Sequence, residues 1–193
     1  MNLTKPAKYI SYLFIPPTMN LIIFTIYSFF YEPVPKSYYG IVISFFFGLL
    51  LPLIAIFEFR RKGVISDNNA TIKEERWLPY IFAIGFSLSG VVFSSLTGLN
   101  EKIIMLWMVY LVNSILIINI NRFWKISAHA VGAAIPLGAL TLIGDFIPLF
   151  ILALIFIFVC SSRIILKVHT FMQVIAGAVS GFIVSFVLLN YCL

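Results

Sequence analysis

Charged side chains are scarce in this sequence. Asp, Glu, Lys and Arg make up 10% of its 193 residues, whereas 62% of the residues are hydrophobic. Soluble domains are about half apolar and about one quarter charged, so this composition excludes a domain with water as its only solvent. A bilayer core needs around 20 apolar residues per helix, and the sequence offers such runs repeatedly. We therefore expect an all-α, multi-pass integral membrane protein.

Cysteine is almost absent, with only Cys160 and Cys192 in the chain. Both lie in or at the end of apolar runs, without the spacing of a metal site and without a disulfide partner in a loop. We interpret them as packing residues. The tryptophans lie near expected helix ends, as membrane-interface anchors do, and do not indicate a cofactor site. We expect no metal ion and no cofactor.

Acidic residues are the scarcer of the two charged classes. The chain has 13 Lys and Arg against 7 Asp and Glu, which gives a net charge of +6. The basic residues are scattered over short loops and do not form the basic module of a nucleic-acid-binding protein. We therefore expect lipid or phosphate as the partner, and no nucleic acid.

Seven apolar segments account for most of the chain. Each is long enough to span, or nearly span, a bilayer. The segments are 9–31, 39–57, 79–98, 103–120, 128–143, 146–162 and 170–190. Small residues around Gly177 and Gly181 predict that the last helix approaches a neighbour closely. We expect one membrane domain over residues 1–193.

Proline and glycine interrupt this pattern at three places. Pro16 and Pro17 predict a kink in the first segment, and Pro52 predicts one in the second. The Gly144-Asp145 pair separates the fifth segment from the sixth, with Asp145 expected to cap the following helix. Because the prolines kink spans and the Gly144-Asp145 pair separates two of them, the expected number of spans is seven.

The basic residues are distributed unequally between the two faces of a seven-span bundle. The face with the N-terminus and the loops after spans two, four and six carries 11 of the 13. These are Lys5, Lys8, Arg60, Arg61, Lys62, Lys73, Arg76, Arg122, Lys125, Arg163 and Lys167. The other face carries only Lys36 and Lys102. The positive-inside rule then predicts a cytoplasmic N-terminus and an external C-terminus.

The chain contains two histidines, His129 and His169, each at the start of an apolar segment on the basic face. A membrane histidine is often a packing residue, and that interpretation stays open. The residues near the two histidines favour an anion-binding site. Ser127 and the free amides of a helix beginning near it can hold an anion, and Arg163 lies six residues before His169.

Two motifs that contain these histidines resemble motifs of the type 2 phosphatidic acid phosphatase superfamily. The third family motif is Ser-Arg, five residues, His, three residues, Asp. Segment 162–173 fits it at every spacing, except that Gln173 replaces the aspartate. The second family motif, Pro-Ser-Gly-His, is similar to Ile-Ser-Ala-His at 126–129, which keeps the serine and the histidine.

The first family motif, Lys, six residues, Arg-Pro, is matched in residue type only. Lys73 and Arg76 lie in the expected loop without that spacing. Two expected spans separate the first motif from the second, and two more separate the second from the third, so all three return to one face. The resemblance covers about residues 67–181 and implies a phosphatase-like helical core there.

The resemblance implies a membrane phosphatase that hydrolyses a lipid phosphate monoester or diphosphate without a metal. His169 would be the nucleophile that forms a phosphohistidine, and His129 the general acid for the leaving alkoxide. Gln173 would hold the second ring nitrogen of His169 without supplying a negative charge. The phosphate-binding residues would be Lys73, Arg76, Ser127 and Arg163.

Gln173 and the altered first motif support an alternative function, a non-catalytic family member that binds phosphorylated lipid or acts as a membrane assembly subunit. Glu74, Glu75 or Asp67 could replace the lost carboxylate, or could simply face solvent, and both interpretations stay open. A third possibility is a prenyltransferase-like protein. It ranks last because it needs clustered aspartates for magnesium, and loop 59–78 contains only Asp67.

Overall fold

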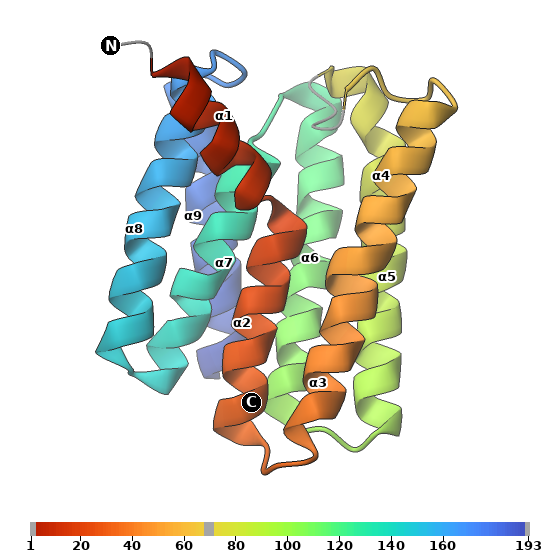
Figure 1. Cartoon of the computed structure of the whole chain (residues 1–193), viewed down its shortest axis with the longest axis vertical. Helices are drawn as coiled ribbons and strands as arrows, with labels where there is room; N and C mark the ends of the chain where they lie inside the picture. The colour runs from red at the N-terminus through yellow and green to blue at the C-terminus, as the bar shows by residue number, and fades with distance from the viewer. Residues whose placement is uncertain (1–2, 68–71, 192–193) are drawn as a thin grey trace. The chain divides into compact units, whose positions relative to one another are not determined.

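The computed structural model describes residues 3–67 and 72–191, and the secondary structure of these residues is helical throughout (Figure 1). The helices are α1 (Thr4–Leu13), α2 (Pro16–Tyr31), α3 (Ser37–Ile43), the π-helical η1 (Ser44–Leu50), α4 (Leu51–Arg61), the 3-10 helix η2 (Lys73–Arg76), α5 (Trp77–Leu96), α6 (Glu101–Phe123), α7 (Ala128–Ile143), α8 (Phe146–Ile165) and α9 (Phe171–Tyr191). Cys192 lies outside the described residues.

The chain forms two compact units. Unit 1 comprises Met1–Ile23 and Ile126–Leu193, and unit 2 comprises Phe24–Lys125. The chain passes from unit 1 to unit 2 within α2 and returns between α6 and α7. The single domain expected over residues 1–193 stays a prediction.

Within the described residues, five helical stretches are long and apolar enough to cross a bilayer. They are Ser37–Arg61, Lys73–Leu96, Glu101–Phe123, Phe146–Ile165 and Phe171–Tyr191. The bent pair α1 and α2 counts as a sixth if it forms one span. Helix α7 has 16 residues, fewer than the 20 or so that a bilayer core requires. The protein is therefore a multi-pass integral membrane protein, and the count of seven spans stays a prediction.

The first apolar segment is broken between α1 and α2, which are bent by 52°. Pro16 and Pro17 lack backbone donors, and their rings obstruct the preceding turn. The Thr18 hydroxyl donates to the carbonyls of Leu13 at 2.7 Å and Ile15 at 3.1 Å, which satisfies groups that the break frees. The expected kink is confirmed. The separate helix α1, however, was not expected from the apolar pattern.

In unit 1, α7 packs along α8 and α9 (Figure 1). The backbones of α7 and α9 are too close for larger residues at two glycines. A Cβ atom at Gly177 would lie 2.6 Å from the Ser127 carbonyl oxygen, and one at Gly181 would lie 2.5 Å from that of Val131. The close approach expected for the last helix is confirmed, because small residues permit it. The same contact fixes the start of α7 against α9.

The turn between α7 and α8 follows the sequence expectation. Gly144 adopts a left-handed conformation with φ 71° and ends α7. The Asp145 carboxylate then accepts a hydrogen bond from the Ile147 amide at 3.0 Å and caps α8. This turn lies at the opposite end of α7 from Ser127.

In unit 2, α5 packs against α6, and α3, η1 and α4 form one continuous helical stretch. Gly90 of α5 leaves room for the indole of Trp107, because a Cβ atom there would lie 2.2 Å from the ring. The π-helical segment η1 ends at Leu50, shortly before Pro52, which removes a backbone donor in the first turn of α4. The kink expected at Pro52 stays a prediction.

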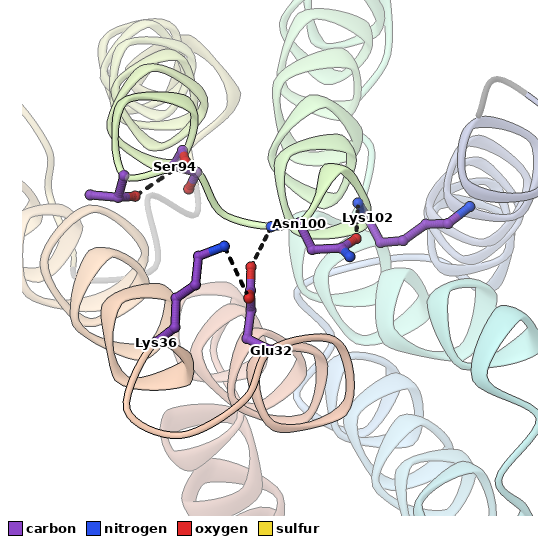
Figure 2. Close-up of polar contacts among 6 residues, drawn as sticks. Glu32, Lys36, Ser94, Asn100 and Lys102 are labelled. Atoms are coloured by element: carbon purple, nitrogen blue, oxygen red, sulfur yellow. Dashed lines mark hydrogen bonds and ion pairs between the residues drawn. The ribbon is translucent and has the colours of Figure 1, made fainter.

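A buried carboxylate joins two connections of unit 2 (Figure 2). Glu32, at the end of α2, accepts a hydrogen bond from the Asn100 backbone amide and lies 3.2 Å from the Lys36 ammonium. Asn100 in turn caps α6 by accepting from the Lys102 amide at 2.9 Å. The α2–α3 and α5–α6 connections are thereby held together. Glu32 was not predicted as a structural residue; its signal in the sequence is its four-residue spacing from Lys36.

Candidate functional site

The candidate residues of unit 1 lie at three helix ends. Ser127 precedes α7, Arg163 occupies the last turn of α8, and His169 stands in the connection before α9. Ser127 is the N-cap of α7, with an extended backbone and a buried hydroxyl that accepts from the Ala130 amide at 3.4 Å. Serine favours this position because its side chain satisfies a first-turn amide that has no intrahelical partner.

The α8–α9 connection folds back onto the end of α8. The backbone amides of Val168 and His169 donate to the Arg163 carbonyl at 3.3 and 3.4 Å. Lys167 reverses the chain with a left-handed φ of 55°, a conformation that few non-glycine residues adopt. This fold-back places the His169 backbone against the last turn of α8, beside Arg163.

Arg163 is almost fully buried, with 1% of its surface exposed. Its guanidinium donates a hydrogen bond to the hydroxyl of Ser11, which lies on the buried face of α1. A buried guanidinium needs such polar partners because burial removes its hydration. Ser11 was not among the residues predicted from the sequence. The four-residue spacing of Ala7 and Ser11, two small residues on one helix face, was the only available signal.

Gln173 and Thr170 form a reciprocal capping box at the start of α9. The Thr170 hydroxyl accepts from the Gln173 amide at 3.4 Å, and the Gln173 side-chain oxygen accepts from the Thr170 amide at 3.2 Å. This is the Ser/Thr-x-x-Glu/Gln arrangement that begins many helices. Gln173 therefore has a structural role as the fourth residue of the capping box that begins α9.

The same Gln173 oxygen lies 3.1 Å from Nδ1 of His169. Because a backbone N–H of Thr170 donates to this atom, the atom facing the ring must be the oxygen and not the amide nitrogen. Nδ1 of neutral His169 must then carry the proton, and Nε2 carries the lone pair. The capping box thus selects the ring tautomer in which Nε2 is the basic nitrogen.

Direct hydrogen bonds connect most of the predicted residues of unit 1. The Gln173 carbonyl accepts from the Ser127 amide at 3.2 Å, which links the start of α9 to the start of α7. Gln173 also contacts His169, whose amide contacts the Arg163 carbonyl. His129 lies buried in the first turn of α7, two residues after Ser127. The second and third motifs are therefore brought together at one end of unit 1.

Lys73 and Arg76 belong to unit 2, where each contacts its own neighbours. The Lys73 ammonium donates to the Arg122 carbonyl at 3.2 Å, and Asn121 donates to the Lys73 carbonyl at 3.0 Å. Arg76 is buried and shares a hydrogen bond with the Tyr80 side chain one turn later. The predicted role of both cations in phosphate binding stays a prediction.

The acidic residues of the same loop have separate environments. The Glu75 carboxylate accepts from the amide and the hydroxyl of Ser66 at 2.8 and 2.9 Å, so it organises the loop itself. The Glu74 side chain is 72% exposed and lies 3.9 Å from the Lys73 ammonium. For these two residues the structure favours loop and solvent roles over replacement of the missing motif carboxylate.

Comparisons of the chain with protein-family models, with curated proteins and with solved structures found no match.

Proposed function

We propose that this protein binds the phosphate group of a membrane lipid at the motif residues of unit 1 and hydrolyses the phosphate ester through His169. The observation that carries the proposal is the contact between His169 and Gln173, in which the Thr170 amide fixes the orientation of the Gln173 side chain. This arrangement leaves Nε2 of His169 as the nucleophilic nitrogen.

The charge of this end of unit 1 suits an anionic ligand. The sequence of unit 1 contains one carboxylate, Asp145, which lies at the far end of α7 from Ser127. Arg163 and Lys167 contribute positive charges at the near end. The first-turn amides of α7 add the partial positive charge of a helix N-terminus. A phosphate group of a lipid matches this environment, since guanidinium binds phosphate oxygens through paired donors.

The proposed reaction has two steps. Nε2 of His169 attacks phosphorus and forms a P–N bond, while the P–O bond to the lipid alcohol breaks and His129 donates a proton to the leaving alkoxide. Water then attacks the phosphohistidine, gives its proton to His129, and releases inorganic phosphate with His169 regenerated. Arg163 binds the phosphoryl oxygens during both steps.

Gln173 supplies one of the two functions that an aspartate would supply. In a serine protease triad, replacing aspartate by asparagine lowers turnover about 10⁴-fold because the imidazole adopts the wrong tautomer. Here the capping box holds the amide oxygen toward Nδ1, so the correct tautomer is kept and only the stabilising charge is missing. We therefore expect catalysis that is slow but present.

Release of inorganic phosphate from a panel of lipid phosphate monoesters and diphosphates tests the proposal. Purified protein in detergent should release phosphate equally with and without a chelator, and His169→Ala should abolish the release. The matched control is Ser180→Ala, because the Ser180 hydroxyl donates to the Gly177 carbonyl within its own helix at 3.1 Å. Chelator-sensitive release, or release that survives His169→Ala, would refute the histidine mechanism.

A second candidate function is lipid-phosphate binding without catalysis. The capping box favours it, because helix capping alone accounts for a glutamine at position 173. In that case lipid phosphate should bind to the purified protein, Arg163→Gln should weaken the binding, and no phosphate should be released from any member of the panel.

A further inference from the structure

Helix α1 has one face against the protein and another that is exposed. Ala7 and Ser11 form the buried face, and α1 packs against α8. The exposed face carries large apolar side chains, with Tyr9 77%, Leu13 61% and Tyr12 57% exposed. Exposed apolar residues are ordinary where a membrane protein meets lipid, but in α1 they accompany exposed charges.

The charges of α1 all have one sign. Lys5 and Lys8 are exposed, and the segment Thr4–Leu13 contains no acidic residue. Lysines next to tyrosines in one short amphipathic helix are typical of segments that lie at the bilayer surface, with the aromatic rings at headgroup level. The lysines indicate a surface with anionic headgroups.

The geometry of α1 agrees with a position at the surface. The helix is bent by 52° from α2, so the two axes cannot both follow one span direction. The Thr18 hydroxyl bonds at the break hold the carbonyls of Leu13 and Ile15. A helix of ten residues is about 15 Å long, too short to cross a bilayer core.

Ser11 connects this surface helix to the candidate site. The hydroxyl of Ser11 accepts a hydrogen bond from the guanidinium of Arg163, and both side chains are buried. This hydrogen bond joins α1 to Arg163. The carbonyl of Arg163 in turn accepts a hydrogen bond from the His169 amide. Movement of α1 away from α8 would therefore remove a partner of Arg163.

We propose that α1 docks on anionic lipid headgroups through Lys5 and Lys8, and that Ser11 transmits this docking to Arg163. The partner is the bilayer surface itself, and Ser11 is a positioning residue. The effect of docking on phosphate chemistry rests on the function proposed above, whereas the docking of α1 does not. Lipid composition would thereby regulate the same site that acts on a lipid phosphate.

The depth of a spin label tests the docking without any enzymatic assay. The label is attached at Tyr9→Cys in full-length protein that also carries Cys160→Ala and Cys192→Ala. Its accessibility to oxygen and to a polar nickel chelate is measured in phosphatidylcholine vesicles with and without phosphatidylglycerol. We expect a deeper label in the anionic vesicles, and a loss of this difference in Lys5→Gln/Lys8→Gln, with a change of about fivefold per lysine in the docked to undocked ratio.

Lys102→Gln is the control for charge, since Lys102 lies at the start of α6 in unit 2. It should leave the response of the label unchanged. The proposal would be overturned if the depth of the label did not change with phosphatidylglycerol. It would also be overturned if the depth still changed in Lys5→Gln/Lys8→Gln.

The mobility of the same label tests the link through Ser11. Ser11→Ala should increase the mobility, Ser11→Thr should keep it low, and Ser180→Ala should have no effect. Equal mobility in all variants would show that Ser11 does not couple α1 to α8 and would overturn that link. If the label responds as expected but no lipid phosphate is hydrolysed, the docking of α1 stands and the proposed hydrolysis fails.

Discussion

Thr170 and Gln173 bind each other twice, and the second of these hydrogen bonds fixes the atom that faces His169. The Gln173 side-chain oxygen accepts from the Thr170 amide at 3.2 Å and lies 3.1 Å from Nδ1 of the histidine. A helix cap and a candidate nucleophile thus share one acceptor atom. Substitutions at these two positions can separate the structural role from the catalytic one.

Gln173→Glu should raise turnover. Glutamate has the length of glutamine, so its carboxylate keeps both hydrogen bonds and adds the charge that stabilises the imidazolium. Charge-assisted hydrogen bonds are about twice as strong as neutral ones, which corresponds to about tenfold in rate. Gln173→Asp is one methylene shorter and should gain less. Phosphate release under saturating lipid phosphate measures both.

If the protein only binds lipid phosphate, the same two variants should weaken binding, because a carboxylate near the anion repels it. Release of phosphate and binding of lipid phosphate, measured side by side in wild type and Gln173→Glu, therefore distinguish the two functions. A glutamate variant that binds less tightly and releases no phosphate would end the catalytic proposal.

Thr170→Ala should lower stability and leave the orientation of Gln173 intact. The substitution removes the hydroxyl that caps α9, which costs about 1 kcal/mol, but the backbone amide that holds the Gln173 oxygen remains. Thermal unfolding in detergent should show the loss, while phosphate release below the unfolding temperature should stay close to that of wild type. A large fall in release at unchanged stability would contradict this separation of roles.

Gly177→Ala should displace the start of α7. The added Cβ atom would meet the Ser127 carbonyl oxygen at 2.6 Å, and backbone at that distance cannot move aside without shifting the N-cap. Overpacking of this kind costs about 1–3 kcal/mol. Gly85→Ala is the matched control in a helix, because a Cβ atom at Gly85 has nothing within 4 Å. Gly177→Ala should lower both the midpoint of thermal unfolding and the affinity for lipid phosphate. Gly85→Ala should lower neither.

Much of the local structure of this chain could be predicted because short-range chemistry determines it. The break at Pro16, the turn at Gly144 and the cap at Asp145 each depend on residues adjacent in sequence. The glycines of α9 predicted a close approach of helices, although not the partner helix. The coarse class, a multi-pass helical membrane protein, depends on composition alone.

The features that sequence reasoning missed depend on contacts between distant residues. Ser11 meets Arg163 across 152 positions, and Glu32 meets Asn100 across 68. The local spacings, Ala7 to Ser11 and Glu32 to Lys36, do not indicate these distant partners. The motif resemblance predicts Gln173 only as a substituted catalytic residue. Its capping box with Thr170 has a four-residue pattern that is also visible in the sequence.

Glu32→Gln should destabilise unit 2 without affecting phosphate release. The Glu32 side chain is 4% exposed, and neutralising it removes the charge that binds the Lys36 ammonium and the Asn100 amide. Hydrogen bonds to charged groups contribute about 1.5–3 kcal/mol, so the midpoint of thermal unfolding should fall clearly. Lys36→Gln should cost less, since the Lys36 side chain is 38% exposed and solvent replaces much of its role. Equal losses in the two variants would argue against a special role for the buried carboxylate.

The orientation in the membrane is the last prediction. For a seven-span chain, the 11 to 2 division of basic residues between the faces predicts that the N-terminus and the motif face lie in the cytoplasm. Single cysteines are introduced next to Lys102 and next to Arg122, in protein without Cys160 and Cys192. A membrane-impermeant maleimide added to intact cells should label the first position and not the second, whereas both should react after permeabilisation. The reverse pattern would place the motif face outside. Labelling of both positions from outside would contradict a single membrane crossing by α6 between Lys102 and Arg122.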